Sequence, residues 1–80
     1  MTIAEIKMKV HDFLHSKVDP YRLNDDEDIF ASGLVNSLLA LEIVTYLERT
    51  FSIEVESEDM DIDNFRTINA ISHFVENKMG

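Results

Sequence analysis

Three aspartates at alternating positions have the spacing that opens a calcium-binding loop: Asp59, Asp61 and Asp63. An EF-hand loop also needs a glycine at its sixth position and a bidentate glutamate at its twelfth. Those positions hold Asn64 and Ala70. Because the pattern fails on both requirements, we expect no dedicated calcium site, although the acidic surface can still hold divalent cations loosely.

Two histidines stand four residues apart, a spacing at which one face of a helix can bind a metal. His11 and His15, however, point away from the apolar positions of their own segment, and no third ligand follows nearby. His73 is isolated near the end of the chain. We therefore expect surface histidines and no metal site.

Ser37 has a hydroxyl group that could act as a nucleophile. In many hydrolases such a serine lies in a Gly-x-Ser-x-Gly turn, but the flanking positions here are Val35 and Leu39. A chain of 80 residues also has little room for a pocket that excludes water. The sequence therefore predicts a protein that is not an enzyme.

The segment around Ser37 has the features of a helix start instead. Gly33 permits a turn, and Asn36 is a good N-cap. The N-terminus of a helix favours negative charge, which suits a phosphodiester on Ser37. Leu38 begins the outward face of the helix as an exposed apolar side chain beside that hydroxyl. From these residues alone, an attached phosphate group is one hypothesis among several.

Periodicity and capping residues predict the elements that position these residues. The first helix is expected over residues 3 to about 17, with a capping box of Thr2 and Glu5 at its start and Pro20 to end it. A second helix is expected over residues 37 to about 50 and a brief helical turn within residues 57–63. The last helix follows Thr67, which caps it. Residues 18–36 form a long polar connection. The predicted fold class is all-α: a small four-helix bundle of three long helices and one short one, with a long loop between the first two.

The apolar positions of the long helices fall on one face of each and predict the core. They are Ile3, Ile6, Val10, Phe13 and Leu14; Ala40, Ile43, Val44, Leu47 and Phe51, with Leu41 at the edge; and Ile68, Ile71, Phe74, Val75 and Met79. Apolar residues outside the helices should pin their segments to this core: Ile29, Phe30, Leu34 and Val35 in the long connection, and Ile53 and Val55 after the second helix. The opposite face of the second helix carries Leu38, Glu42, Thr45 and Arg49.

Length, charge and cysteine content limit the class of protein. Eighty residues without an internal repeat predict one domain, residues 1–80. The net charge of −9 disfavours nucleic acid, anionic membranes and self-association, so we expect a monomer. There is no cysteine, no signal peptide and no apolar run of membrane-spanning length, which predicts a cytoplasmic protein. The excess of acids is concentrated in residues 37–63, which contain eight acidic residues and one basic residue. This predicts a surface that meets basic partners.

The sequence resembles the acyl and peptidyl carrier proteins over nearly its whole length. The family's motif is an aspartate, the modified serine and a leucine at the start of the second helix; here it reads Gly33-Leu34-Val35-Asn36-Ser37-Leu38. The resemblance continues in Asp28-Ile29-Phe30, Leu41-Glu42-Ile43-Val44, Leu47-Glu48, Phe51-Ser52-Ile53-Glu54-Val55 and Phe65-Arg66-Thr67-Ile68.

The resemblance implies a 4'-phosphopantetheine cofactor, attached covalently to Ser37 by a phosphopantetheinyl transferase. Its terminal thiol would hold an acyl intermediate as a thioester for delivery to partner enzymes, namely acyltransferase, ketosynthase, dehydrogenase or adenylation enzyme. Four residues match family positions that contact such partners, Leu38, Glu42, Thr45 and Glu48, and Asn36 beside Ser37 is expected to belong to the same interface. Of these, Glu48 projects nearer the boundary between the two faces of its helix.

Two departures bear on the pathway. Asn36 stands where the family usually has aspartate, which puts recognition by the transferase in question. Leu39 and Arg49 stand where carriers of fatty-acid synthesis usually have acids. The sequence looks most like discrete carriers of polyketide or hybrid natural-product pathways, among them carriers of unusual malonyl-type extender units such as hydroxymalonyl or methoxymalonyl.

Two alternatives stay open beside this acyl carrier. One is an aminoacyl carrier, either a D-alanyl or a peptidyl carrier protein, because the cargo is chosen by other enzymes. The other is an adaptor without the arm, which binds partners through its second helix only.

Overall fold

The computed structural model describes residues 2–17, 24–31, 33 and 35–80. Their elements are α1 (Ile3–His15), α2 (Ser37–Phe51), the 3₁₀-helix η2 (Ser57–Asp59), α3 (Ile62–Phe65) and α4 (Ile68–Met79). Three long helices and a short one, with no strand in the described part, confirm the predicted all-α bundle. No described helix has the length and apolarity needed to cross a membrane.

The long helices begin where their capping residues predict. The side-chain oxygens of Thr2, Asn36 and Thr67 accept the backbone N–H groups of Glu5 (3.3 Å), Leu39 (2.9 Å) and Ala70 (2.9 Å). The Thr2 hydroxyl also donates to the Glu5 carboxylate at 3.3 Å. α1 ends at His15, two residues before the predicted end, where the Ser16 hydroxyl donates to the Phe13 carbonyl at 2.7 Å.

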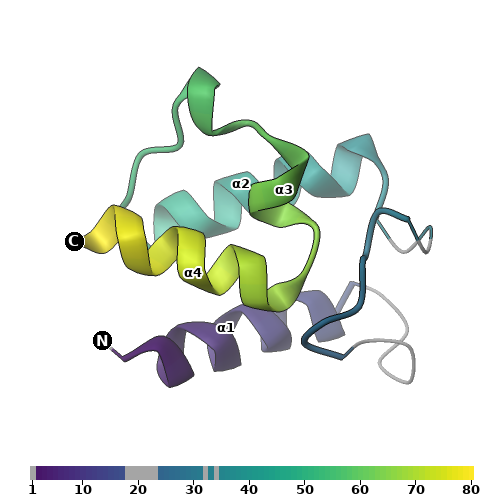
Figure 1. Cartoon of the computed structure of the whole chain (residues 1–80), viewed down its shortest axis with the longest axis horizontal. Coiled ribbons are helices and arrows are strands. Elements are labelled where there is room, and N and C mark those ends of the chain that lie inside the picture. Colours follow the sequence, from purple (N-terminus) through teal and green to yellow (C-terminus); the bar gives the residue numbers. More distant parts are fainter. Residues whose placement is uncertain (1, 18–23, 32, 34) are drawn as a thin grey trace.

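α4 lies at the centre of the bundle and packs against α1, α3 and α2. Figure 1 shows α1 running along one side of α4 and α2 behind it, with the N- and C-termini at the same end of the molecule. The core consists of most of the predicted inward positions joined by residues from the connections: Ile6, Val10, Leu14, Ile29, Val35, Ile43, Leu47, Phe51, Phe65, Ile68, Ile71, Phe74 and Val75. Four predicted core residues are only half-buried: Ile3, Phe13, Ala40 and Val44.

The connection before α2 is pinned to the junction of α3 and α4. Ile29 and Val35 are buried, as predicted, and Phe30 is half-buried. The Ile29 N–H donates to the Arg66 carbonyl at 2.8 Å, and the Asn69 N–H donates to the Asp25 carbonyl at 3.1 Å. Leu34 and residues 18–23 lie outside the described residues.

The segment between α2 and α4 differs in detail from the prediction. In place of one turn within residues 57–63 there are two short elements, η2 and α3, and each has an acidic cap: Glu56 and Asp59 form a capping box on η2, and Asp61 caps α3. The expected burial of Ile53 and Val55 is only partial.

Two apolar side chains are more exposed than their helical positions suggest. Met79 was expected to face inward, but its side chain is exposed because it lies on the last residue of α4, beyond the packed part of the helix. Leu41, placed at the edge of the buried face of α2, is 59% exposed.

Candidate functional site

Ser37 is the first residue of α2, and its side chain is exposed. Asn36, directly before it, has an extended backbone and caps the helix through its side-chain oxygen. No acidic residue lies in the first turn of α2. Because a helix N-terminus carries partial positive charge, a negatively charged group on the Ser37 hydroxyl would be stabilised there.

The position of Ser37 is fixed by the chain that leads to it. Gly33 adopts φ +80°, a conformation that glycine tolerates best, and its N–H donates to the Phe30 carbonyl at 3.2 Å. The buried Val35 then donates its N–H to the Ile29 carbonyl at 2.9 Å. This short hydrogen-bonded turn holds the start of α2 against the junction of α3 and α4.

A hollow of about 310 Å³ lies between α2 and α3 beside Ser37. Its lining is mostly apolar and consists of Phe30, Ser37, Ala40, Val44, Met60, Asp61, Ile62 and Phe65. An exposed hydroxyl, a helix start without acids and an adjoining apolar hollow fit a long phosphate-linked arm. Ser37 is the residue here that could hold it.

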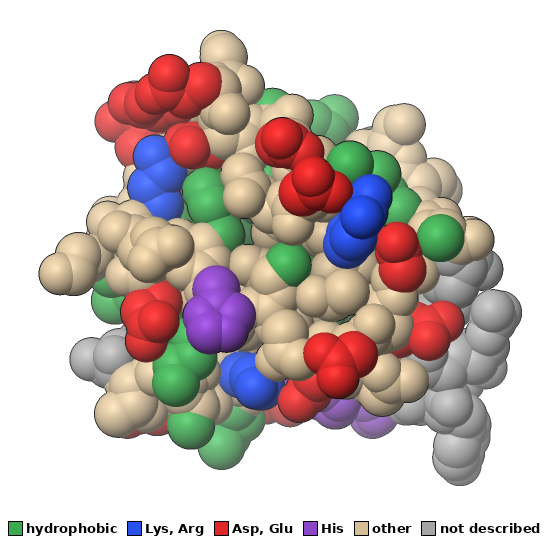
Figure 2. Space-filling model, viewed as in Figure 1, with side chains coloured by type: hydrophobic (Ala, Val, Ile, Leu, Met, Phe, Trp, Pro, Cys, Tyr) green, Lys and Arg blue, Asp and Glu red, His purple; other side chains and the backbone are tan. Residues whose placement is uncertain are grey.

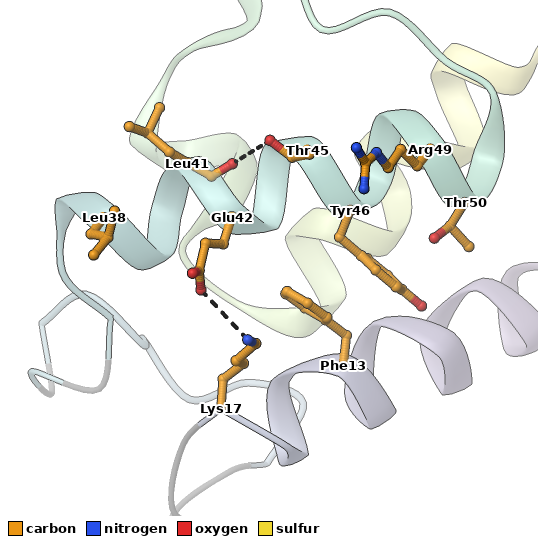
Figure 3. A pocket seen from close by; sticks show the side chains of 9 residues that line it. All are labelled: Phe13, Lys17, Leu38, Leu41, Glu42, Thr45, Tyr46, Arg49 and Thr50. Carbon is orange, nitrogen blue, oxygen red and sulfur yellow. Dashed lines mark hydrogen bonds and ion pairs between the residues drawn. The ribbon is translucent and has the colours of Figure 1, made fainter.

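A second depression of about 430 Å³ lies on the other side of α2, facing α1, and we call it the α1–α2 groove. Figure 3 shows its lining side chains: Phe13, Lys17, Leu38, Leu41, Glu42, Thr45, Tyr46, Arg49 and Thr50. Three of the predicted partner-contacting residues, Leu38, Glu42 and Thr45, are thereby brought together. Leu38 lies next to Ser37, so the groove begins at the candidate attachment residue.

Two of these three predicted residues have polar partners within the protein. The Glu42 carboxylate lies 3.8 Å from the Lys17 ammonium, and the Thr45 hydroxyl donates to the Leu41 carbonyl at 3.0 Å. Glu42 therefore presents a charge that is partly neutralised.

Glu48 lies apart from the groove. Its carboxylate accepts the backbone N–H of Val55 at 3.0 Å, and the residue is only partly exposed. The structure gives Glu48 a local role, which is to fix the chain after α2, and does not bring it together with the other predicted partner residues.

Sequence reasoning did not include Leu41 and Arg49 among the site residues, although both line the groove. Arg49 could have been found, because it shares the outward face with Leu38, Glu42 and Thr45. Leu41 could not, because its place at the edge of the apolar face is equally compatible with burial.

The three alternating aspartates each have a partner in the protein. The Asp59 carboxylate pairs with the Lys78 ammonium, the Asp61 carboxylate accepts the Asp63 N–H at 2.9 Å, and Asp63 lies 3.2 Å from the Arg66 guanidinium. The rings of His11 and His15 stack with centroids 5.6 Å apart. Across the residues that the structure describes, no three His, Cys, Asp or Glu side chains are grouped so that they could hold a metal.

Comparison with known proteins agrees with the geometry at the start of α2. Residues 4–75 match the PP-binding family, described as a phosphopantetheine attachment site. The chain is 29% identical to a D-alanyl carrier protein of Lactococcus lactis subsp. cremoris over 75 residues, which are 91% of this chain and 95% of the relative. It is 37% identical over 51 residues to a D-alanyl carrier protein of Streptococcus pyogenes, which covers 64% of this chain and 65% of that protein. With nearly its whole length matched, the chain belongs to the family of carrier proteins that bear a covalent 4'-phosphopantetheine.

Proposed function

We propose that this protein carries an aminoacyl group, D-alanyl or a related one, on a phosphopantetheine arm attached to Ser37. The cargo is proposed from one observation, the similarity to D-alanyl carrier proteins over nearly the whole chain. The aminoacyl carrier was the alternative to a polyketide acyl carrier in the sequence analysis. The named relatives favour it over that first interpretation.

The assignment of the arm to Ser37 draws on the local geometry. The hydroxyl is exposed at a capped helix start with no acid in the first turn, and an apolar hollow adjoins it. When bound, the arm supplies a terminal thiol, which this cysteine-free chain lacks, and that thiol holds the cargo as a thioester.

The protein's own contribution is to tether and present the cargo. A tether raises the effective concentration of the cargo at a partner's active site without any new contact. The partners of this function are a phosphopantetheinyl transferase, an adenylation enzyme that loads the amino acid, and an enzyme that receives it. The chain itself catalyses no step.

Loading of the arm tests the cargo. The phosphopantetheinylated protein is incubated with ATP and a D-alanine-activating adenylation enzyme, and its intact mass is measured before and after hydroxylamine, which cleaves thioesters. We expect a gain of one alanyl group that hydroxylamine removes. Ser37→Ala should show no gain, and Ser57→Ala, a matched change at another exposed serine, should load normally.

Two outcomes would contradict the proposal. If an acyltransferase loads a malonyl-type group while no aminoacyl group is accepted, the protein is an acyl carrier. If Ser37 accepts no arm from several transferases in a folded protein, the arm-less adaptor is the better interpretation.

A further inference from the structure

The α1–α2 groove has a preformed floor. The rings of Phe13 and Tyr46 stack in parallel with centroids 4.2 Å apart, and the Tyr46 hydroxyl donates to the Lys9 carbonyl on α1 at 3.0 Å. The Lys17 ammonium lies 5.8 Å from the centre of the Phe13 ring. Because contacts between α1 and α2 hold these side chains, a partner would meet a surface that needs little ordering.

Two apolar side chains stand at the end of the groove nearest Ser37. Leu38 is 69% exposed and Leu41 is 59% exposed. Exposed apolar side chains grouped around a depression, with polar residues at the rim, are typical of protein interaction sites. The pair offers a place for one bulky apolar side chain of a partner.

The charge of the groove is opposite to that of the whole protein. Its charged lining residues are Lys17, Glu42 and Arg49, and the first two pair with each other. Within the described part of the chain no carboxylate lies within ion-pair distance of Arg49, whose side chain extends along α2 towards Thr45 in Figure 3. On a protein of net charge −9, the groove therefore presents one uncompensated positive charge.

The spacing of these features sets the distance between the complementary groups of a partner. Arg49 follows Leu41 by eight residues of α2, which corresponds to about 12 Å at the rise of an α-helix. An apolar side chain and a carboxylate two turns apart on a second helix span about the same distance.

We propose that the α1–α2 groove receives an amphipathic helix of the cargo-loading enzyme, with an apolar side chain between Leu38 and Leu41 and a carboxylate on Arg49. This inference rests on the proposed function, because it places a loading enzyme beside Ser37. It differs from the expectation drawn from composition, in which the acids of residues 37–63 meet basic partners. Arg49 is then a specificity determinant that selects partners with an acid at this position.

Two synthetic helical peptides test the inference without the arm or a cargo. They share one sequence with a leucine on the apolar face and differ only in a Glu or a Lys placed two helical turns, about seven residues, further along the same face. Each is titrated into isotope-labelled protein, and binding is followed by NMR chemical shifts. The protein variants are Arg49→Glu, Leu41→Ala and Lys9→Glu. Lys9→Glu is a matched charge reversal, because the Lys9 side chain is exposed and does not line the groove, and the substitution keeps the backbone carbonyl that accepts from Tyr46.

We expect the Glu peptide to bind roughly threefold to fivefold more tightly than the Lys peptide, as for an exposed ion pair, even though the net charge of the protein favours the Lys peptide. Arg49→Glu should reverse this preference, Lys9→Glu should keep it, and Leu41→Ala should weaken both peptides. The shifts should centre on Phe13, Tyr46 and Arg49.

Equal or tighter binding of the Lys peptide, shifts centred on residues 54–63, or no saturable binding of either peptide would overturn the inference. A failure of Ser37 to accept phosphopantetheine would not change the peptide titrations, which use the protein without the arm. Failure of this inference can therefore be distinguished from failure of the proposed function.

Discussion

Asn36 caps α2 at the position where the family usually has an aspartate. Its side-chain oxygen accepts the Leu39 N–H at 2.9 Å, so the neutral amide is sufficient to satisfy the helix start. The charge that it omits would lie beside the candidate attachment residue. Stability and recognition can therefore be separated at this residue.

Substitutions of Asn36 should change the free energy of unfolding in opposite directions. Asn36→Ala should lower it by about 1 kcal/mol because the cap is lost. Asn36→Asp should raise it by about 0.3–1 kcal/mol at pH 7, because a carboxylate interacts favourably with the helix dipole. Urea unfolding at pH 7 and pH 3 measures both, and the gain from aspartate should vanish at pH 3. An alanine variant as stable as the parent would contradict the cap.

Ser52 ends α2 in the left-handed conformation, with φ 54° and ψ 43°. This conformation is strained for residues other than glycine. Where a helix ends in this conformation, the residue is usually a glycine. Ser52→Gly removes the steric cost of this conformation but adds the entropy cost of ordering a glycine, so it should raise the free energy of unfolding by about 0.5–1 kcal/mol. Ser57→Gly is the control, because Ser57 begins η2 and is not among the residues with positive φ. Destabilisation by Ser52→Gly would argue against this helix end.

At the scale of the element, η2 is attached to the C-terminal end of α4 by one ion pair. The hydrogen bond from Lys78 holds the pKa of Asp59 below its ordinary value of 3.8, and the backbone N–H of Glu56 acts in the same direction. The same bond raises the pKa of Lys78 above 10.5. The Glu56 carboxylate raises the pKa of Glu58 through a hydrogen bond and through its charge.

The pH range of this attachment follows from those directions. A lowered pKa of Asp59 contributes stability above pH 3.8, which is lost as the pH falls through the still lower folded value. A raised pKa of Lys78 contributes stability below pH 10.5, which is lost as the pH rises through the higher folded value. The ion pair is thus present throughout the neutral range.

Lys78→Met should release η2 from α4 while it keeps an apolar stem against Phe74. We expect the pKa of Asp59 to return towards 3.8 and the amides of residues 56–60 to exchange faster. Carboxyl titration by NMR and hydrogen exchange measure these effects. Lys9→Met, on an exposed lysine of α1, should change neither. An unchanged titration of Asp59 in Lys78→Met would contradict the ion pair.

The three long helices could be predicted from the sequence because each combines a capping residue with a full apolar face. The segment between α2 and α4 was predicted only coarsely, since elements of three and four residues are too short to show periodicity. The caps Glu56 and Asp61 were visible in the sequence, but they lie in a run of acids that could all serve as caps. The place of Ser37 at a helix start could also be predicted, because Asn36 is a capping residue and the apolar face of α2 begins directly after it. The groove was not, because it depends on Phe13 and Tyr46 meeting from two helices.

On the scale of the whole molecule, the negative charge is distributed unevenly. Figure 2 shows acidic side chains gathered over η2 at one corner of the molecule, with a basic side chain beside them. The segment of residues 54–63 has six acids and no base, whereas α2 has Glu42 and Glu48 against Arg49. The acidic face predicted from composition therefore belongs to the segment after α2 more than to α2 itself.

This charge should make stability depend on salt. The protein measures 31 × 26 × 18 Å, and at about 10 mM salt the screening length is about 30 Å. The repulsion among its excess acids therefore acts across nearly the whole molecule at that salt concentration. The unfolding temperature should rise between about 10 mM and 500 mM NaCl, and less steeply in a Glu54→Gln, Glu58→Gln double variant. A fall with salt would show that the ion pairs outweigh the repulsion.

The proposed function depends first on the phosphopantetheine arm being attached to Ser37. The most direct measurement is the intact mass of the protein after incubation with coenzyme A, magnesium and a broad-specificity phosphopantetheinyl transferase, beside Ser37→Ala and Ser57→Ala. We predict that the parent and Ser57→Ala each gain one phosphopantetheinyl group and that Ser37→Ala gains none. A gain in Ser37→Ala, or no gain in the folded parent with several transferases, would contradict attachment of the arm to Ser37.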